Sequence, residues 1–571
     1  MDATKVIIDA VDRFRQGRTG PLILELDLTE GVVDGPPSDP LGALMSMRRT
    51  RLSDILSGLK HARRDERVKA LIVKIGGHPI GLGLVQELRG AVQEFRRSGK
   101  RAVAYAETFG EFGAGTVPYY LATAFDTIYL QPSGDVGFTG ISLEQRFVKD
   151  ALDKLGVKYQ LAQRHEYKTG ANMFTQDHMT EAHRESAARL AESVTEQIVA
   201  AVAEARGLEP KRVRELIDQG PFFGTEAVQA NLVDRLAYRD EVYDEIKAAV
   251  RAEAGHDPRL QYVTRYHKAV LPRKLPHPGE QVIALIHGHG AIRLGRSGRS
   301  PLSGGGGAMG ADTISAAIRA ARQDDRIKAI VFRVDSPGGS YVASDTIWRE
   351  VVLTRGSGKP IIVSMGNVAA SGGYFVAMGA NAIVAQPGTL TGSIGVFGGK
   401  PVVDELLSKI GVATEAVAEG ANAGMFSIAR EFSEEQWARV NAWLDHVYDD
   451  FVGKVAEGRG LDRDRAHELA RGRVWTGADA QARGLVDELG GLEDALALAR
   501  RKAGLADDAP VRPYPRLNPL ERLRPAESSE DKAAAVARVR LEAWGPIAGL
   551  ASELGLPLYG PLILPGNWTI R

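Results

Sequence analysis

Short apolar runs alternate with helical stretches through the second half of the chain. Four of these runs predict strands, at residues 282–286, 329–334, 360–365 and 382–387. Helical spacing or the start of a helix is found at residues 311–324, 344–356 and 370–380. A glycine- and serine-rich stretch at 295–310 predicts a flexible loop. Strands separated by helices pair in parallel, so this pattern predicts an α/β fold.

The first half of the chain repeats this pattern. The decamer QPSGDVGFTG at 131–140 returns as QPGTLTGSIG at 386–395, 255 positions later. The strand-like segment 65–75 matches 324–334 at an offset of 259, and an SGK triplet recurs at the same offset. A repeat of this length is far too long for a solenoid. We therefore predict two homologous α/β domains in tandem, each with a parallel sheet and flanking helices.

Each copy turns mostly helical after its last predicted strand. Long amphipathic helices are predicted near 178–206 and 433–459. Glycines and prolines between 252 and 280 mark the boundary between the copies. The predicted domains are residues 1–260 and 261–510, followed by an extension at 511–571 that has no copy. For that extension, which includes a predicted helix near 529–544, we expect packing or oligomer contacts.

Composition narrows the class of protein. The 571 residues carry a formal net charge of zero, which gives no reason to expect nucleic-acid binding. The chain has no cysteine, which excludes disulfides and a cysteine nucleophile. Its first twenty residues lack the apolar stretch of a signal peptide. The long uncharged run at 360–399 contains many glycines and a proline, so we interpret it as strand, helix, strand rather than a membrane span.

Two turns in the second copy suggest chemistry. Gly338 and Gly339 follow a predicted strand in DSPGGS, where glycines let backbone N–H groups approach a ligand. Ser371 follows the next strand in AASGGYF, with Gly372 after it at the start of a helix. Each motif alone has an ordinary explanation as a Pro-Gly turn or a helix N-cap. Together they predict a serine nucleophile beside an oxyanion hole.

The first copy has lost this turn and carries a different candidate. In the repeat register Ser371 faces Thr116, and Pro118, which has no N–H, stands where the second copy has a glycine. Lys168 instead faces Gly420. A lysine base needs its pKa lowered from about 10.4 towards neutrality, a shift worth about 4 kcal/mol that burial can supply. A solvated surface charge is the ordinary alternative for a lysine.

Histidine is the other common base for a serine. His287 and His289 lie at the end of the first predicted strand of copy two, with no acidic partner evident from spacing. We expect them to have a loop or core role rather than to bind metal or act as a base. No convincing Ser-His-Asp set emerges from the twelve histidines.

These motifs together resemble the signal peptide peptidase A (protease IV) family in its long two-domain form. The resemblance rests on DSPGG, the SGGYF turn at Ser371, GSIGVFGGK at 392–400 and EYKTGANMF around Lys168, and it covers about residues 20–500. It implies a fold like that of the Clp protease and crotonase superfamily. It also implies a Ser-Lys dyad divided between the copies. The oxyanion hole would use Gly372 and one of Gly338 or Gly339, and Ser393 would help hold the lysine amine.

The resemblance further implies a serine endopeptidase that cleaves signal peptides and other hydrophobic peptides without metal or cofactor. It implies a homo-oligomer, a tetramer in the long form, at the bacterial cell membrane. Long-form members begin with a membrane-spanning helix that is not evident here, so a cytoplasmic location is the alternative. Two other functions stay open: a crotonase-type acyl-CoA enzyme, and an inactive scaffold that binds membrane proteins.

Overall fold

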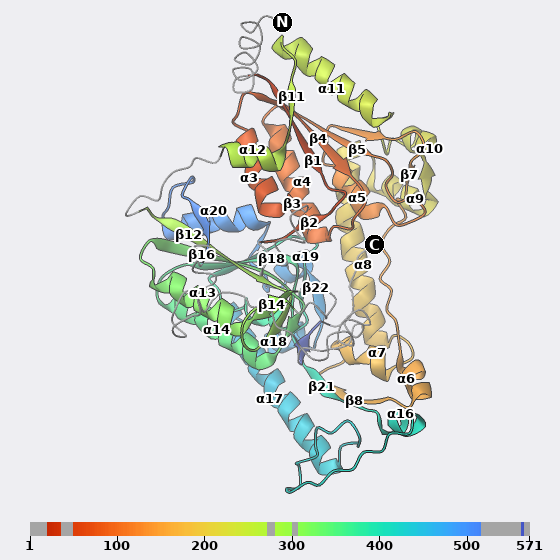
Figure 1. The fold of residues 1–571 in the computed structure, drawn as a ribbon, viewed down its shortest axis with the longest axis vertical. Helices are drawn as coiled ribbons and strands as arrows, with labels where there is room; N and C mark the ends of the chain where they lie inside the picture. The colour runs from red at the N-terminus through yellow and green to blue at the C-terminus, as the bar shows by residue number, and fades with distance from the viewer. Residues whose placement is uncertain (1–19, 36–49, 271–279, 300–306, 515–560, 565–571) are drawn as a thin grey trace, which may run out of the picture.

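The computed structural model describes residues 20–35, 50–270, 280–299, 307–514 and 561–564 (Figure 1). The first copy contains a six-stranded sheet in the order β10-β6-β5-β4-β1-β11. All of its neighbouring strands pair in parallel. The strands are β1 (Leu22–Asp27), β4 (Val68–Ile75), β5 (Arg101–Ala106), β6 (Thr127–Leu130), β10 (Arg235–Leu236) and β11 (Arg259–Tyr262).

The second copy contains an eight-stranded sheet with the path β22-β20-β18-β16-β12-β24, while β19 pairs with β18 and β23 with β19. Its pairings are parallel except that of β20 with β22. The strands are β12 (Val282–His289), β16 (Ile327–Ser336), β18 (Ile361–Ala370), β19 (Ala382–Ala385), β20 (Leu390–Gly392), β22 (Val474–Thr476), β23 (Glu488–Leu489) and β24 (Val511–Pro513). The predicted α/β fold with one parallel sheet in each copy is thereby confirmed.

Helices pack on both sheets, close to where the pattern predicts them. In copy one the main helices are α3 (Leu52–Ala62), α4 (Leu82–Arg97), α5 (Thr116–Ala122), α8 (Glu181–Arg206) and α11 (Arg239–Ala254). In copy two they are α13 (Ala311–Gln323), α14 (Tyr341–Gly356), α15 (Gly372–Phe375), α17 (Glu434–Arg459) and α20 (Leu492–Ala503). The helix α8 runs from the first copy down beside the second (Figure 1).

Two predicted elements differ from the structure. The helix expected at 370–380 is the four-residue α15, because the Ala377 and Met378 N–H groups both donate to the Tyr374 carbonyl and close the chain into turns. The loop predicted at 295–310 has an antiparallel pair at its ends, β14 (Gly298–Arg299) with β15 (Gly307–Gly310). That pair forms because β15 also adds in parallel to the edge of β13 (Ala291–Arg293), which supplies backbone partners.

The repeated SGK triplet has a structural role in both copies. Lys100 donates from Nζ to the carbonyls of Ala62 and Asp65 at 2.5 and 2.6 Å. Lys359 donates in the same way to three carbonyls at the end of α13 and just after it, at 2.8–2.9 Å. Carbonyls at a helix C-terminus lack partners within the helix, so a lysine there satisfies them and fixes the helix against the sheet.

The two copies share one hydrophobic core. Buried side chains of α4, such as Val85, belong to the same apolar cluster as Val331 and Ile362 on one face of the second sheet. The helix α4 packs on β18, and α20 covers the same sheet on β16 and β18. The opposite face of that sheet packs in a second cluster with α13, α14 and α17. The copies are therefore joined by core packing and not only by surface contact.

A buried ion cluster also crosses the boundary between the copies. Arg333 on β16 is 1% exposed and donates to Asp34 at 2.7 Å and to Glu87 on α4 at 2.5 Å, both from copy one. Glu87 also accepts from the N–H of Leu492 at the start of α20 at 2.9 Å. Buried charges are tolerated when each is paired and hydrogen-bonded, and this cluster adds specific polar contacts between the copies.

The uncharged run at 360–399 begins with β18, α15 and β19, as the strand, helix, strand interpretation predicted, and it continues through β20 into a further strand, β21 (Phe397–Val402). None of the helices in the described ranges is long and apolar enough to cross a membrane. The C-terminal extension contributes two described pieces, β24 at the edge of the second sheet and a short strand, β25 (Leu562–Ile563). The helix predicted near 529–544 lies outside the described residues.

Candidate active site

Ser371 stands at a strained corner between β18 and α15. Its backbone has φ 55° and ψ −115°, and its N–H donates to the Gly392 carbonyl at 2.8 Å. A positive φ on a residue other than glycine costs about 1–3 kcal/mol, so the surrounding structure has to hold it there. Such a strand-to-helix corner is the way many hydrolases present a nucleophilic serine. The side chain is fully buried.

Lys168 comes from copy one but is held by copy two. The strand β8 (Lys158–Gln163) of copy one pairs antiparallel with β21 (Phe397–Val402) of copy two over six residue pairs. The next residue, Arg164, donates its N–H to the Val396 carbonyl at 2.8 Å. Further along, Gly472 packs so closely on the Lys168 backbone that no Cβ would fit there. Lys168 therefore follows a strand that is added to the other copy, and this strand brings it towards the serine.

The amine of Lys168 meets the serine directly. Its Nζ lies 2.8 Å from Ser371 Oγ, 2.9 Å from Ser393 Oγ and 2.9 Å from the Ser393 carbonyl oxygen. The lysine is 1% exposed, and burial lowers its pKa to about 7. No acidic side chain contributes to that pKa. A large fraction of the amine is therefore unprotonated near neutral pH and able to accept a proton.

The candidate oxyanion glycines lie beside this pair. The strand β17 (Gly338–Gly339) follows β16, and both glycines have positive φ, 102° and 154°. A Cβ on Gly338 would lie 2.7 Å from the Gly372 amide nitrogen, which puts the two turns in contact. The Gly338 N–H donates to Ser336 Oγ at 3.1 Å. The structure thus brings together all six residues that the sequence singled out: Ser371, Lys168, Gly372, Gly338, Gly339 and Ser393.

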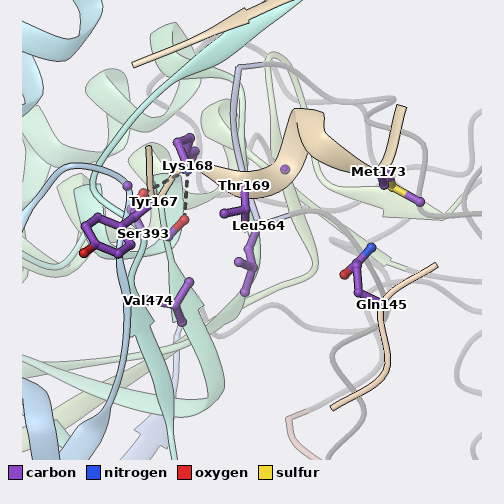
Figure 2. Close-up of a pocket in the computed structure, with 10 residues that line it drawn as sticks. Gln145, Tyr167, Lys168, Thr169, Met173, Ser393, Val474 and Leu564 are labelled. Atoms are coloured by element: carbon purple, nitrogen blue, oxygen red, sulfur yellow. Dashed lines mark hydrogen bonds between the residues drawn. The ribbon is translucent and has the colours of Figure 1, made fainter. Parts of the chain in front are cut away.

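A small cavity opens next to Lys168. Figure 2 shows it lined by Tyr167, Lys168, Met173, Ser393, Val474 and Leu564, among others. Sequence reasoning missed Leu564, which lies in the extension that has no copy, and Gly472, which lies in copy two but outside the motifs that drew attention. It also missed Ser336, whose Oγ accepts from Gly338 and donates to the Gly290 carbonyl at 2.7 Å. The letters DSPGG contain that serine, but its bond to the turn is visible only in three dimensions.

The matching corner in copy one cannot do this chemistry. In the repeat register, α5 begins one residue earlier than α15. The N–H of its N-cap residue, Gly115, donates to the Gly137 carbonyl, as the Ser371 N–H donates to the Gly392 carbonyl. The backbone position of Ser371 is therefore taken by Gly115, a shift of one from the register that paired Ser371 with Thr116. Thr116 Oγ1 accepts from two backbone N–H groups at 3.1 and 3.2 Å, and within the described ranges it has no lysine partner.

His287 and His289 do not join the site. His287 and His289 lie on β12, and Nδ1 of His289 is 3.7 Å from Asp335 Oδ2, an acidic neighbour that spacing did not reveal. Burial lowers the pKa of His287 to about 4. Neither histidine hydrogen-bonds to Ser371 among the described residues, whose Oγ is instead contacted by Lys168.

Comparison with known proteins identifies the family. The chain matches Peptidase family S49 over residues 94–253 and again over 354–506, one match in each copy. This chain belongs to peptidase family S49. It is 33% identical over 448 residues to the chloroplastic serine protease SPPA of Arabidopsis thaliana, an alignment covering 78% of this chain and 64% of the plant protein. It thus spans less than two thirds of that relative.

A second relative, Protease 4 of Salmonella typhi, is 33% identical over 505 residues, covering 84% of this chain and 78% of that protein. Among solved structures, a mutant of ClpP1 from Listeria monocytogenes aligns at 14% identity with a TM-score of 0.24, over 37% of this chain and 94% of that one. The resemblance to the long two-domain form of the family is confirmed, and this S49 member falls in a family of serine-type peptidases.

Proposed function

We propose that this S49 chain is a serine endopeptidase with a dyad divided between its two copies. Neutral Lys168 takes the proton of Ser371 as Oγ attacks the carbonyl carbon of a peptide bond. The oxyanion accepts hydrogen bonds from the N–H of Gly372 and of Gly338 or Gly339. The C–N bond then breaks, and the Lys168 ammonium protonates the departing amine. Water, deprotonated by the same lysine, hydrolyses the acyl-enzyme and frees the serine.

One observation carries this proposal: a buried amine with a pKa of about 7 lies 2.8 Å from a strained serine hydroxyl. A lysine paired with a carboxylate would stay protonated and could not act as a base, whereas burial alone favours the neutral amine. Ser393 supports the arrangement, because its Oγ and carbonyl oxygen hold the amine from a second side. The substrates we propose are signal peptides and other hydrophobic peptides.

The test compares peptide cleavage by Ser371→Ala, Lys168→Met and wild type, using a fluorogenic aliphatic peptide. Each substitution should lower kcat by at least about a thousandfold, the usual consequence of losing a nucleophile or its base. Thr116→Ala, at the matching corner of copy one, is the control and should keep wild-type activity. Cleavage retained by either dyad variant, in protein that folds, would refute the proposed roles.

We also propose that the chain forms a homo-oligomer, with a tetramer as the expected size. The segment 413–418 of copy two corresponds by repeat register to β8, and 142–147 of copy one corresponds to β21, yet neither forms a strand. Phe174 of copy one is 2% exposed and stacks on Tyr159, whereas its counterpart Phe426 is 77% exposed. We propose that the contact made inside one chain also forms between chains. A head-to-tail contact that is repeated builds a ring when the rotation between neighbours closes, and the ring proposed here has four chains.

The substitution Phe426→Asp tests this assembly. Light scattering after size exclusion should give a mass near four chains for wild type and a smaller species for the variant. Leu489→Asp, at a half-exposed position elsewhere, serves as the matched control and should leave the mass unchanged. A wild-type mass of one chain, or an unchanged mass for Phe426→Asp, would contradict the proposed contact.

A further inference from the structure

A short piece of the C-terminal extension lies against the candidate active site as an added strand. In β25, Ile563 pairs with Gly338 and Leu562 with Gly339 in antiparallel register. The N–H of Leu564 donates to the Pro337 carbonyl at 2.5 Å. On the opposite edge, the Phe397 N–H donates to the Pro561 carbonyl at 3.3 Å. The segment Pro561–Leu564 is therefore bound along both edges.

All three aliphatic side chains of this segment are buried, each in a different apolar cluster. Leu562 is fully buried in the core of copy two. Ile563 packs with Ala171 and Phe397. Leu564, which is 6% exposed, belongs to the same apolar cluster as Ala370, the residue before the candidate nucleophile, and it also lines the cavity beside Lys168 (Figure 2). Burial of an aliphatic side chain of this size stabilises a complex by about 1.5–3 kcal/mol.

This is the position that a peptide substrate needs. Proteins commonly bind an extended peptide by adding it as a strand to an open edge, with pockets for alternate side chains. The edge used here is the Gly338–Gly339 turn, which the proposed oxyanion hole requires. A Cβ on Gly338 would overlap the Leu562 carbonyl oxygen, so the glycine is what lets the segment approach so closely. A substrate backbone and this segment exclude each other.

We propose that Pro561–Leu564 is an internal pseudosubstrate, which fills the peptide groove beside the dyad and has to leave before a substrate binds. The proposal rests on the proposed peptidase function, since it assigns the groove to peptide substrates. An intramolecular competitor raises the apparent KM by the inverse of the fraction of free groove and leaves kcat unchanged. For a segment that buries three aliphatic side chains, we expect an effect of about tenfold or more.

Two variants test this in the full chain. Leu564→Asp places a charge in the apolar seat of the segment, and a deletion of residues 561–571 removes it. Both should lower KM for an aliphatic peptide by about tenfold with kcat unchanged. Leu489→Asp is the matched control and should have the wild-type KM. Unchanged KM in both variants of an active enzyme would overturn the pseudosubstrate and leave the peptidase standing.

A binding measurement gives the same test without catalysis. A labelled synthetic peptide of residues 559–564 should bind the deletion variant, as followed by fluorescence anisotropy, and should bind wild type at least about tenfold more weakly. The same peptide with aspartate in place of Leu564 should not bind. These results are expected even in a Ser371→Ala background. If the peptide binds wild type and the deletion variant equally, or neither of them, the segment does not occupy a peptide groove and the inference is wrong.

A structural role for the segment has its own signature. If both variants fold but lose activity, and the added peptide restores it, then β25 is a required part of the site rather than a competitor. That outcome would overturn the inference. If wild type and both variants all lack activity that depends on Ser371, the proposed peptidase function fails, and the binding result alone decides whether the groove accepts the segment.

Discussion

The pH dependence of catalysis follows directly from the environment of Lys168. Burial lowers the pKa of this amine to about 7, against about 10.4 for a lysine in water. The base is active only when neutral, so at pH 6 about a tenth of the enzyme is competent, and at pH 5 about a hundredth. We expect kcat/KM to rise tenfold per pH unit below 7 and to level off above about pH 8.

The lowered pKa of Lys168 also predicts how the free energy of unfolding depends on pH. Because the folded pKa is below the unfolded one, the unfolded chain binds the extra proton between pH 7 and about 10.4. The free energy of unfolding therefore rises with pH across this window, by up to about 1.4 kcal/mol per unit from this group. Lys168→Met lacks this contribution. The stability of wild type relative to Lys168→Met should thus increase from pH 7 to pH 9.

Initial rates with a fluorogenic peptide between pH 5 and 9 measure the first prediction, and urea unfolding at pH 7, 8 and 9 measures the second. Lys359→Met is the control, because it removes another lysine whose pKa burial lowers, but one far from Ser371 in the fold. Its kcat/KM profile should match that of wild type. A wild-type plateau reached only above pH 10, or a flat profile from pH 5 to 8, would refute a buried neutral lysine as the base.

Three further substitutions probe the supports of the site. Ser393→Ala removes a hydroxyl that holds the Lys168 amine. It should lower kcat/KM by about tenfold, which corresponds to the roughly 1.4 kcal/mol of one hydrogen bond. An unchanged kcat/KM would show that the Ser393 hydroxyl has no part in catalysis. Gly338→Ala puts a Cβ where the backbone has φ 102° and should lower kcat by about a hundredfold or more. Circular dichroism checks that the variant keeps its fold. A kcat near that of wild type would show that the Gly338–Gly339 turn does not form the oxyanion hole. Arg333→Leu removes the cation that pairs with two buried carboxylates, and it should lower the free energy of unfolding, measured in urea, by about 3–5 kcal/mol. A loss below about 1 kcal/mol would show that the ion cluster does not stabilise the contact between the copies.

The sequence predicted the α/β architecture, because its strands and helices follow from local patterns of apolar residues. Strands such as β16 and β18 are short apolar runs, and the tandem copies are visible as one repeated register. The complementary losses in the two copies drew attention to Lys168, and the family resemblance implied its pairing with Ser371. The glycine turns were recognisable because a close backbone approach restricts the residue type.

Other features depend on contacts that have no local signal. Leu564 reaches the site from an extension without a repeat, so neither periodicity nor register could place it there. The pairing of β8 with β21, which carries Lys168 to the serine, joins segments more than two hundred residues apart. The start of α5 at Thr116 shifted the repeat by one residue, because the Gly115 N–H bonds to the Gly137 carbonyl, a tertiary contact that the apolar pattern does not contain. The membrane location implied by the resemblance stays a prediction.

The central claim is that the two copies build one nucleophile, with the serine from one and the base from the other. Labelling with a serine-reactive fluorophosphonate, followed by peptide mass mapping, measures this most directly. We predict a single labelled position, Ser371, in wild type, and loss of that label in Lys168→Met although the serine is still present. Labelling elsewhere in the chain, or labelling of Ser371 at the wild-type rate without Lys168, would contradict a dyad divided between the copies.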